Sequence, residues 1–205
     1  FNDALRLWCD SLRSILAQVS AGCGQIGCGA SCPAPMVCLV ECQVTEGVSR
    51  DNVDSTCTTF NQAILLTGAP YSASAKYTQD QTSAVILYNM ALCMQLRAMQ
   101  SPEGQQIGLL KALRLYDKAL QLTQCLGSAY GLDLMLSMAS LNNVAAIHAY
   151  FFSDELVQRC LHSLGYCVRV ARETNDHLVL SQDLSVFQMN FTVLMGNSIK
   201  NAPAA

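Results

Sequence analysis

Hydrophobic and polar positions follow a helical period in most of this chain and a period of two in one segment near its end. The longest apolar stretches are SAVILYNMALCMQL at 83–96 and LNNVAAIHAYFF at 141–152. With the start signals described next, the pattern predicts five helices. They are expected near residues 2–20, 81–99, 105–126, 131–151 and 153–173.

Several polar residues stand where helices are expected to begin. Thr78 and Gln81 have the spacing of a capping box, in which each side chain bonds the other residue's backbone N–H. Ser101 before Pro102 fits an N-cap followed by proline in the first turn, and Ser153 precedes two acidic residues. These signals support the predicted starts of three helices.

Two segments are predicted to be strands. In VFQMNFTVLM, apolar residues at 187–195 alternate with Gln188, Asn190 and Thr192, which is typical of a strand. TFNQAILL at 59–66 could supply a second strand, although residues 61–65 would also fit a short helix. A lone strand leaves backbone groups unpaired, so we expect 59–66 to pair antiparallel with 187–195.

One spacing of a small, an aromatic and a small residue recurs in the expected helices. It is clearest at Ala112, Tyr116 and Ala119. Small residues in the preceding helices would let two helices approach closely while the aromatic ring fills the groove between them. The other copies are Ala4, Trp8 and Ser11, and more loosely Val157, Leu161 and Leu164; the small residues of the preceding helices are Ala91 and Ala145.

This arrangement resembles the tetratricopeptide repeat (TPR), a helical-repeat family in which antiparallel helix pairs stack. Four segments resemble, in order, a group of uncharacterised TPR-like proteins of diatoms and related algae: SAVILYNMALCMQLRA, LLKALRLYDKALQL, LNNVAAIHAYF and FQMNFTVLMGNSIKNAPAA. The resemblance implies an all-α, TPR-like stack of antiparallel helix pairs and no particular biochemical role. We expect one domain over 1–205, with a long connection rich in Cys, Gly and Ser at about 21–58.

The composition narrows the choice of partners. Charged residues make up 13% of the 205 residues, so part of the surface is expected to be covered by a protein partner or by copies of the chain. A net charge of -3, with scattered Lys and Arg, gives no footprint for nucleic acid. No uninterrupted apolar run is long enough to span a membrane, so we expect a soluble protein.

Eleven cysteines are unusual, and six of them lie between Cys23 and Cys57. Their spacing contains no Cys-x-x-Cys pair, so small buried thiols are favoured over a zinc site, and disulfides remain a further alternative. Cys160, His162 and Cys167 are close in sequence, and we interpret the two thiols as core residues rather than metal ligands. We therefore expect no metal or other cofactor.

No nucleophile–base pair, paired carboxylates or phosphate loop occurs at an informative spacing, so we expect no enzyme activity. The favoured hypothesis is a protein-interaction or scaffold module within a larger assembly. A self-assembling structural subunit is the alternative, and a Cys-rich metal-binding protein is the third.

Three residues are candidates for partner binding. Asn89 and Asn143 interrupt apolar helices at equivalent positions, each followed by an apolar residue and Ala. A buried amide without a partner is costly, so each Asn is expected to bond either a neighbouring backbone group or a bound chain. His148, on the same helix as Asn143, is expected to be packed and hydrogen-bonded, and is included with the two Asn residues as a partner-binding candidate.

Overall fold

The fold is taken from a computed structural model, which describes residues 36–41, 59–67, 78–100, 102–125, 131–174 and 181–200. These residues form five helices and two short strands, so the all-α class is confirmed. The helices are α3 (Gln79–Gln100), α4 (Gln105–Cys125), α5 (Gly131–Tyr150), α6 (Asp154–Thr174) and α7 (Ser181–Lys200), and the strands are β1 (Met36–Glu41) and β2 (Gln62–Thr67).

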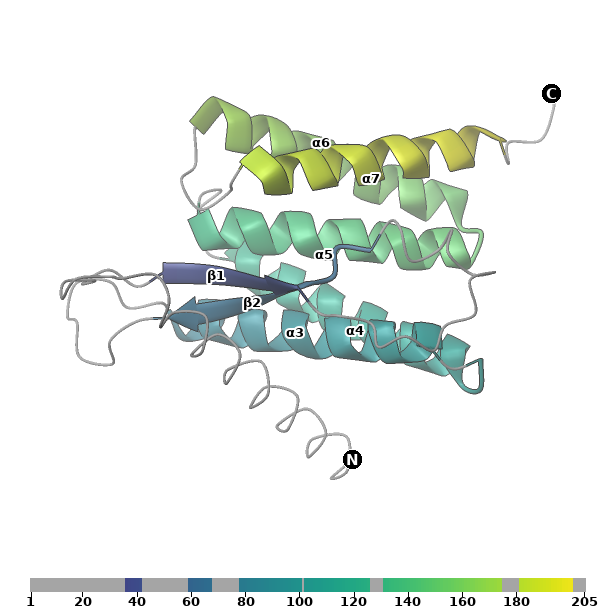
Figure 1. Cartoon of the computed structure of the whole chain (residues 1–205), viewed down its shortest axis with the longest axis horizontal. Coiled ribbons are helices and arrows are strands. Elements are labelled where there is room, and N and C mark those ends of the chain that lie inside the picture. Colours follow the sequence, from purple (N-terminus) through teal and green to yellow (C-terminus); the bar gives the residue numbers. More distant parts are fainter. Residues whose placement is uncertain are drawn as a thin grey trace.

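The helices stack side by side in chain order, with α3 and α4 at one end, α5 between, and α6 with α7 at the other end (Figure 1). Hydrogen bonds between helix ends show the relative directions of the helices. Gln105 at the start of α4 accepts a hydrogen bond from the Tyr150 hydroxyl at the end of α5, so these two helices are antiparallel. Gln81 near the start of α3 bonds Asp133 near the start of α5, so α3 and α5 run in the same direction.

The α3 start has the expected capping box. The Thr78 N–H donates to Gln81 Oε1 at 3.0 Å, and the Gln81 N–H donates to Thr78 Oγ1 at 3.1 Å. Two backbone donors that a helix start leaves unpaired are thereby satisfied. The four predicted helices from 81–99 onward agree with α3, α4, α5 and α6 to within two residues at each end.

The residues of the repeated spacing are buried between the helices. Ala112, Tyr116 and Ala119 on α4 have no exposed surface, and Ala91 on α3 and Ala145 on α5 are equally enclosed. On α6, Val157, Leu161 and Leu164 are also buried. The small residues therefore lie where neighbouring helices approach closely.

The prediction of a strand at 187–195 is wrong, because this segment lies inside α7. The buried residues are Phe187, Asn190 and Leu194, at the helical spacing of three and four, whereas Met189 and Val193 are exposed. The alternation was misleading because the polar residue Asn190 is buried on the packed face of α7, whereas the apolar residues Met189 and Val193 lie on its outer face. Packing of α7 on α5 and α6 determines the conformation instead.

The predicted pairing of 59–66 with 187–195 is therefore also wrong, although most of 59–66 is extended, as expected. Residues 62–67 form β2, which pairs antiparallel with β1, with Leu39 opposite Ile64. The strand β1 lies within 21–58, which we expected to be a connection without regular structure, and it contains Cys38. The predicted helix at 2–20, the first copy of the repeated spacing and the other five cysteines of the 23–57 cluster lie outside the described residues.

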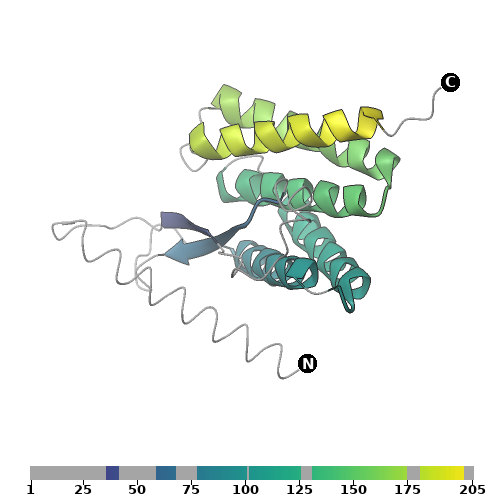
Figure 2. The same cartoon turned by 45° about the vertical axis from the view of Figure 1, so that its right-hand side comes forward.

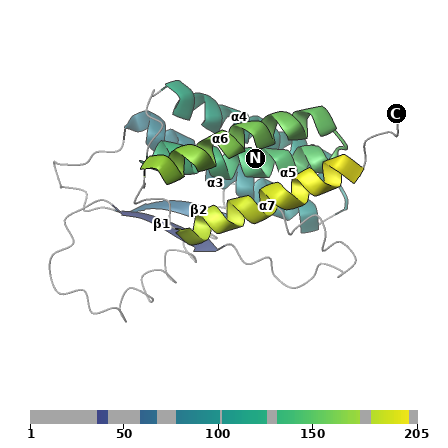
Figure 3. The same cartoon turned by 90° about the horizontal axis from the view of Figure 1, so that it is seen from above.

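The ribbon of β1 and β2 lies against the side of the stack that α3 and α5 form (Figure 2). Among the described helices, β2 contacts α3 most closely, while α4 and α6 occupy the other side of the stack (Figure 3). The first helices of successive pairs therefore share one face, and the extended segment 59–67 runs across it.

Candidate functional site

The strand β2 and the residues just before it are held by two asparagines from two helices. Asn89 of α3 contacts the strand at Ile64. Its Oδ1 accepts from the Ile64 N–H at 3.0 Å, and its Nδ2 donates to the Ile64 carbonyl at 2.8 Å. A single side-chain amide thus satisfies both main-chain groups of one extended residue, as a neighbouring strand would.

Asn143 of α5 repeats this contact at Phe60. The Phe60 N–H donates to Asn143 Oδ1 at 2.7 Å, and Asn143 Nδ2 donates to the Phe60 carbonyl at 3.1 Å. The two amides thus bind residues four apart, about 13 Å of extended chain. We call these two contacts the asparagine clamp.

The clamp uses one edge of the extended segment. Between the two clamped residues, the Gln62 carbonyl accepts from the Tyr88 hydroxyl at 3.0 Å. Both main-chain groups of residues 60 and 64 and the carbonyl of residue 62 therefore point to the helices. In an antiparallel pair the intervening residues face the other way, so Ala63 and Leu65 direct their main-chain groups to β1.

A buried hydrogen-bond network connects the clamp to the helix pair behind it. Asn143 Nδ2 also donates to the Tyr116 hydroxyl at 2.9 Å, and that hydroxyl donates to Gln95 Oε1 at 2.9 Å. Gln95 Nε2 then donates to Thr59 Oγ1 at 3.2 Å. This network joins α5, α4 and α3 to the segment, so the position of Tyr116 in the helix pair also orients Asn143.

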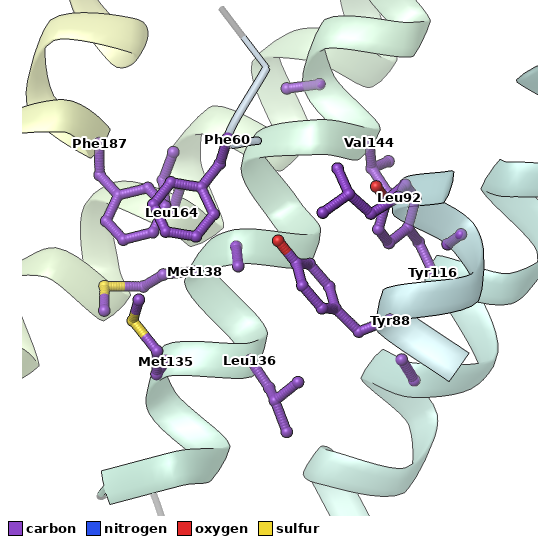
Figure 4. Packing of buried hydrophobic residues seen from close by; sticks show 14 of the residues in the cluster. Phe60, Tyr88, Leu92, Tyr116, Met135, Leu136, Met138, Val144, Leu164 and Phe187 are labelled. Atoms are coloured by element: carbon purple, nitrogen blue, oxygen red, sulfur yellow. The ribbon is translucent and has the colours of Figure 1, made fainter. Parts of the chain in front are cut away.

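The side chains of the segment fill the apolar part of the site. Phe60 is buried and stacks on Phe187 of α7, with ring centroids 4.6 Å apart and an interplanar angle of 29° (Figure 4). Ile64 has no exposed surface. We define the strand groove as the face of α3, α5 and α7 that contacts residues 59–67.

Two further asparagines, Asn142 and Asn190, extend the polar row to α7. Asn190 is buried, and its Nδ2 donates to Asn142 Oδ1 at 3.1 Å. Asn142 Nδ2 in turn donates to Asn143 Oδ1 at 3.2 Å, next to the clamp. The Asn190 Oδ1 atom accepts no hydrogen bond in the described part of the chain. Unlike Asn89 and Asn143, Asn190 therefore does not bind a main-chain N–H of the extended segment.

The structure does not bring His148 to the strand groove. His148 lies on α5, half-buried, and is close enough to Asp117 of α4 for their charges to interact. Burial lowers the pKa of His148 below its ordinary value of 6.5, and the Asp117 carboxylate opposes this. Its main-chain carbonyl accepts from the Ser153 N–H at the turn into α6. His148 thus belongs to the side of α5 that faces α4.

Cys160 and Cys167 are both partly buried on α6. Burial, with a contribution from Asp117, raises the pKa of Cys160 to about 11, and burial also raises the pKa of Cys167. Both cysteines are therefore mainly in the thiol form at neutral pH, which makes them poor nucleophiles and poor metal ligands. Within the described residues, no three His, Cys, Asp or Glu side chains are grouped so as to hold a metal ion.

Two of the three candidate residues, Asn89 and Asn143, thus line one site, and both contact a segment of the same chain. Sequence reasoning missed Tyr88, Gln95 and Phe187 as further residues of the site. Gln95 could have been found, because a polar residue on an apolar helix six positions after Asn89 is a second signal of a buried hydrogen bond.

None of the helices in the described ranges combines the length and the hydropathy needed to cross a membrane. Comparisons with protein-family models, with curated proteins and with solved structures find no match for this chain.

Proposed function

We propose that this chain is a non-enzymatic protein-interaction module that holds an extended strand in the strand groove. The observation that carries the proposal is the asparagine clamp, in which Asn89 and Asn143 each bind both main-chain groups of one residue. Contacts to main-chain groups do not depend on the side chains of the bound strand. A groove built in this way suits a strand supplied by another chain as well as the segment 59–67.

The chemistry of the groove supports binding rather than catalysis. Within the described residues, the side-chain groups that form hydrogen bonds with the segment are the amides of Asn89, Gln95 and Asn143, the hydroxyl of Tyr88 and the thioether of Met99. Neutral amides and hydroxyls donate and accept hydrogen bonds without supplying a nucleophile or a general base at neutral pH. The module is therefore proposed to act by complementarity of its surface.

The helices also pack directly on one another, from α3 with α4 through α6 with α7. The segment lies on the face of this stack rather than between the helices of a pair. Exchange of the segment for another strand therefore leaves the helix–helix contacts in place, which a stacked helical repeat requires.

The test uses a full-length variant whose own segment is weakened by Phe60→Ser and Ile64→Ser. A fluorescent peptide with the sequence of residues 59–67 is titrated into it, and anisotropy reports binding. Saturable binding that Asn89→Ala with Asn143→Ala abolishes supports the proposal. If the weakened variant does not fold, amide exchange of the wild-type chain with excess peptide replaces it: faster exchange at Ile64 marks displacement.

Self-assembly is a second candidate, favoured by apolar side chains on the outer faces of the stack. Met189 and Val193 on α7 are 57% and 39% exposed and lie four residues apart, on one side of the helix. Phe152 at the turn between α5 and α6 is 82% exposed. Light scattering distinguishes the candidates: Met189→Glu with Val193→Glu reduces the size of a self-assembled species and leaves strand binding unchanged.

A further inference from the structure

We infer that two copies of this chain associate face to face through the outer side of α4 and α6. The contact centres on exposed apolar residues near the starts of these helices, which we call the start patch: Ile107, Leu110, Phe152 and Leu156. It is independent of the strand groove, because α4 and α6 occupy the opposite side of the stack (Figure 3).

The start patch is one surface shared by two helices. The helix α5 runs antiparallel to α4, and the turn at residues 151–153 reverses the chain into α6, so α4 and α6 begin at the same end of the stack. The charge of Asp117 on α4 reaches Cys160 on α6. Leu110 lies two turns before Asp117, and Leu156 lies one turn before Cys160, so both leucines are on the facing sides of these helices.

Phe152 is the most exposed residue of the start patch. Its side chain is 82% exposed, and its φ of 55° lies in the left-handed region that favours glycine. The Phe152 N–H donates to the Ala149 carbonyl and the Ser153 N–H donates to the His148 carbonyl, which is the Schellman motif at the end of α5. Glycine would form this motif with less backbone strain. The ring therefore adds apolar contact surface at a cost to the isolated chain.

Charged residues flank the start patch in the same order on both helices. Exposed Glu103 precedes the apolar residues of α4, and exposed Arg114 follows them. Exposed Glu155 precedes Leu156 on α6, and exposed Arg159 lies one turn after it. Because both helices begin at the same end, the outer side of α4 and α6 runs from acidic through apolar to basic.

A surface with this order is complementary to itself when two copies face each other in opposite directions. Two-fold symmetry then places the two start patches against each other at the axis. The acidic end of one copy lies opposite the basic end of the other, whereas copies in the same direction would bring like charges together. The order of charges therefore identifies a second copy as the occupant, and the two-fold axis closes the assembly at a dimer.

Sedimentation equilibrium of the full-length chain over a range of concentrations measures the association. We expect a limiting mass of twice the 22.2 kDa of one chain. Phe152→Gly should weaken the dimer about tenfold or more, because the exposed ring is lost, and should retain the wild-type helical circular dichroism spectrum. Met189→Glu with Val193→Glu, on α7, is the matched control and leaves the dimer unchanged.

A pair of charge variants tests the opposite directions of the two copies. One variant carries Glu103→Lys with Glu155→Lys, and the other carries Arg114→Glu with Arg159→Glu. Each variant alone should be monomeric, because like charges then meet on both sides of the axis. An equimolar mixture should form a heterodimer whose affinity is within about tenfold of the wild-type dimer, because opposite charges meet again.

Three outcomes would overturn the inference. The first is a wild-type chain that stays monomeric at the highest concentration reached. The second is a dimer that survives Phe152→Gly and dissociates with Met189→Glu and Val193→Glu, which would place the interface on α7. The third is a mixture of the charge variants that stays monomeric. If Phe152→Gly loses its helical spectrum, Leu110→Ser provides the same test at an exposed helix position.

Discussion

Asn143 holds Phe60 by both of its main-chain groups, at 2.7 Å from the Phe60 nitrogen and 3.1 Å to the Phe60 oxygen, across 83 positions of sequence. The same amide accepts from Asn142 and donates to Tyr116, so it lies at the centre of a network shared by three elements. One side chain thus links the helix stack to the extended segment.

Asn143→Ala is expected to lower the free energy of unfolding by about 3 kcal/mol or more, because the main-chain groups of Phe60 and the Tyr116 hydroxyl all lose a buried partner. Urea unfolding measures this change.

Asn190→Ala is the matched control for Asn143→Ala. It removes one hydrogen bond to Asn142 and also one buried acceptor without a donor, so its cost is expected to be about 1 kcal/mol or less. Equal losses for the two variants would mean that the asparagine clamp contributes nothing beyond an ordinary buried amide.

Tyr116→Phe is expected to destabilise the fold by about 1–3 kcal/mol, because Gln95 Oε1 and Asn143 Nδ2 lose the hydroxyl between them. Tyr116→Ala removes the buried ring as well and should cost about 3–5 kcal/mol. Thermal and urea unfolding of both variants separate the hydroxyl from the ring. A loss below about 1 kcal/mol for Tyr116→Ala would contradict the burial of this ring between the helices.

Gly108→Ala is expected to destabilise the α3–α4 pair. A Cβ at Gly108 would lie 2.7 Å from the Ala98 Cβ, and neither group has a flexible end that can move away. The clash is expected to exceed the gain of about 1 kcal/mol that Ala gives over Gly inside a helix.

Gly196→Ala on α7 is the control for Gly108→Ala, since no atom lies within 4 Å of the added Cβ. It should stabilise the chain by up to about 1 kcal/mol in urea unfolding. If both substitutions stabilise, the close approach of α3 and α4 is wrong.

The pH dependence of stability has an expected contribution from His148. Burial keeps the folded-state pKa of His148 below its ordinary 6.5, so the unfolded chain binds a proton more readily. The contribution of the neutral His148 imidazole to the free energy of unfolding is fully present above pH 6.5, and it decreases as the pH falls through the folded-state pKa.

His148→Gln should therefore lose less stability between about pH 7.5 and 5.5 than the wild-type chain. His162→Gln, at an exposed position on α6, is the control and should follow the wild type. An identical pH profile for His148→Gln and the wild type in urea unfolding would contradict the burial of this imidazole.

The helices could be predicted from the sequence more accurately than the strands. Four helices could be predicted because their apolar faces and start signals, such as Thr78 with Gln81, are local. The helical conformation of the α7 segment could not be predicted, because its buried face contains the polar residue Asn190. Asn190 is satisfied there by a hydrogen bond to Asn142, which lies 48 residues away in sequence. Local alternation therefore gave the wrong period.

The candidate site was predictable only in part. Asn89 and Asn143 were identifiable because a polar residue in an apolar helix needs a partner. Their partners, Ile64 and Phe60, were not, because the clamp contacts main-chain groups and leaves no signature in the side chains of the bound strand. The pairing of β2 with β1 likewise depends on main-chain contacts between distant segments.

The most direct test of the central claim is native-state amide exchange at Phe60 and Ile64, whose N–H groups donate to Asn143 and Asn89. We expect both amides to be protected to an extent comparable with buried helix residues such as Ala91 and Ala145, and Asn143→Ala to release Phe60 before Ile64. Exchange of both amides at the rate of an unfolded chain, in a protein whose helices remain protected, would contradict the asparagine clamp.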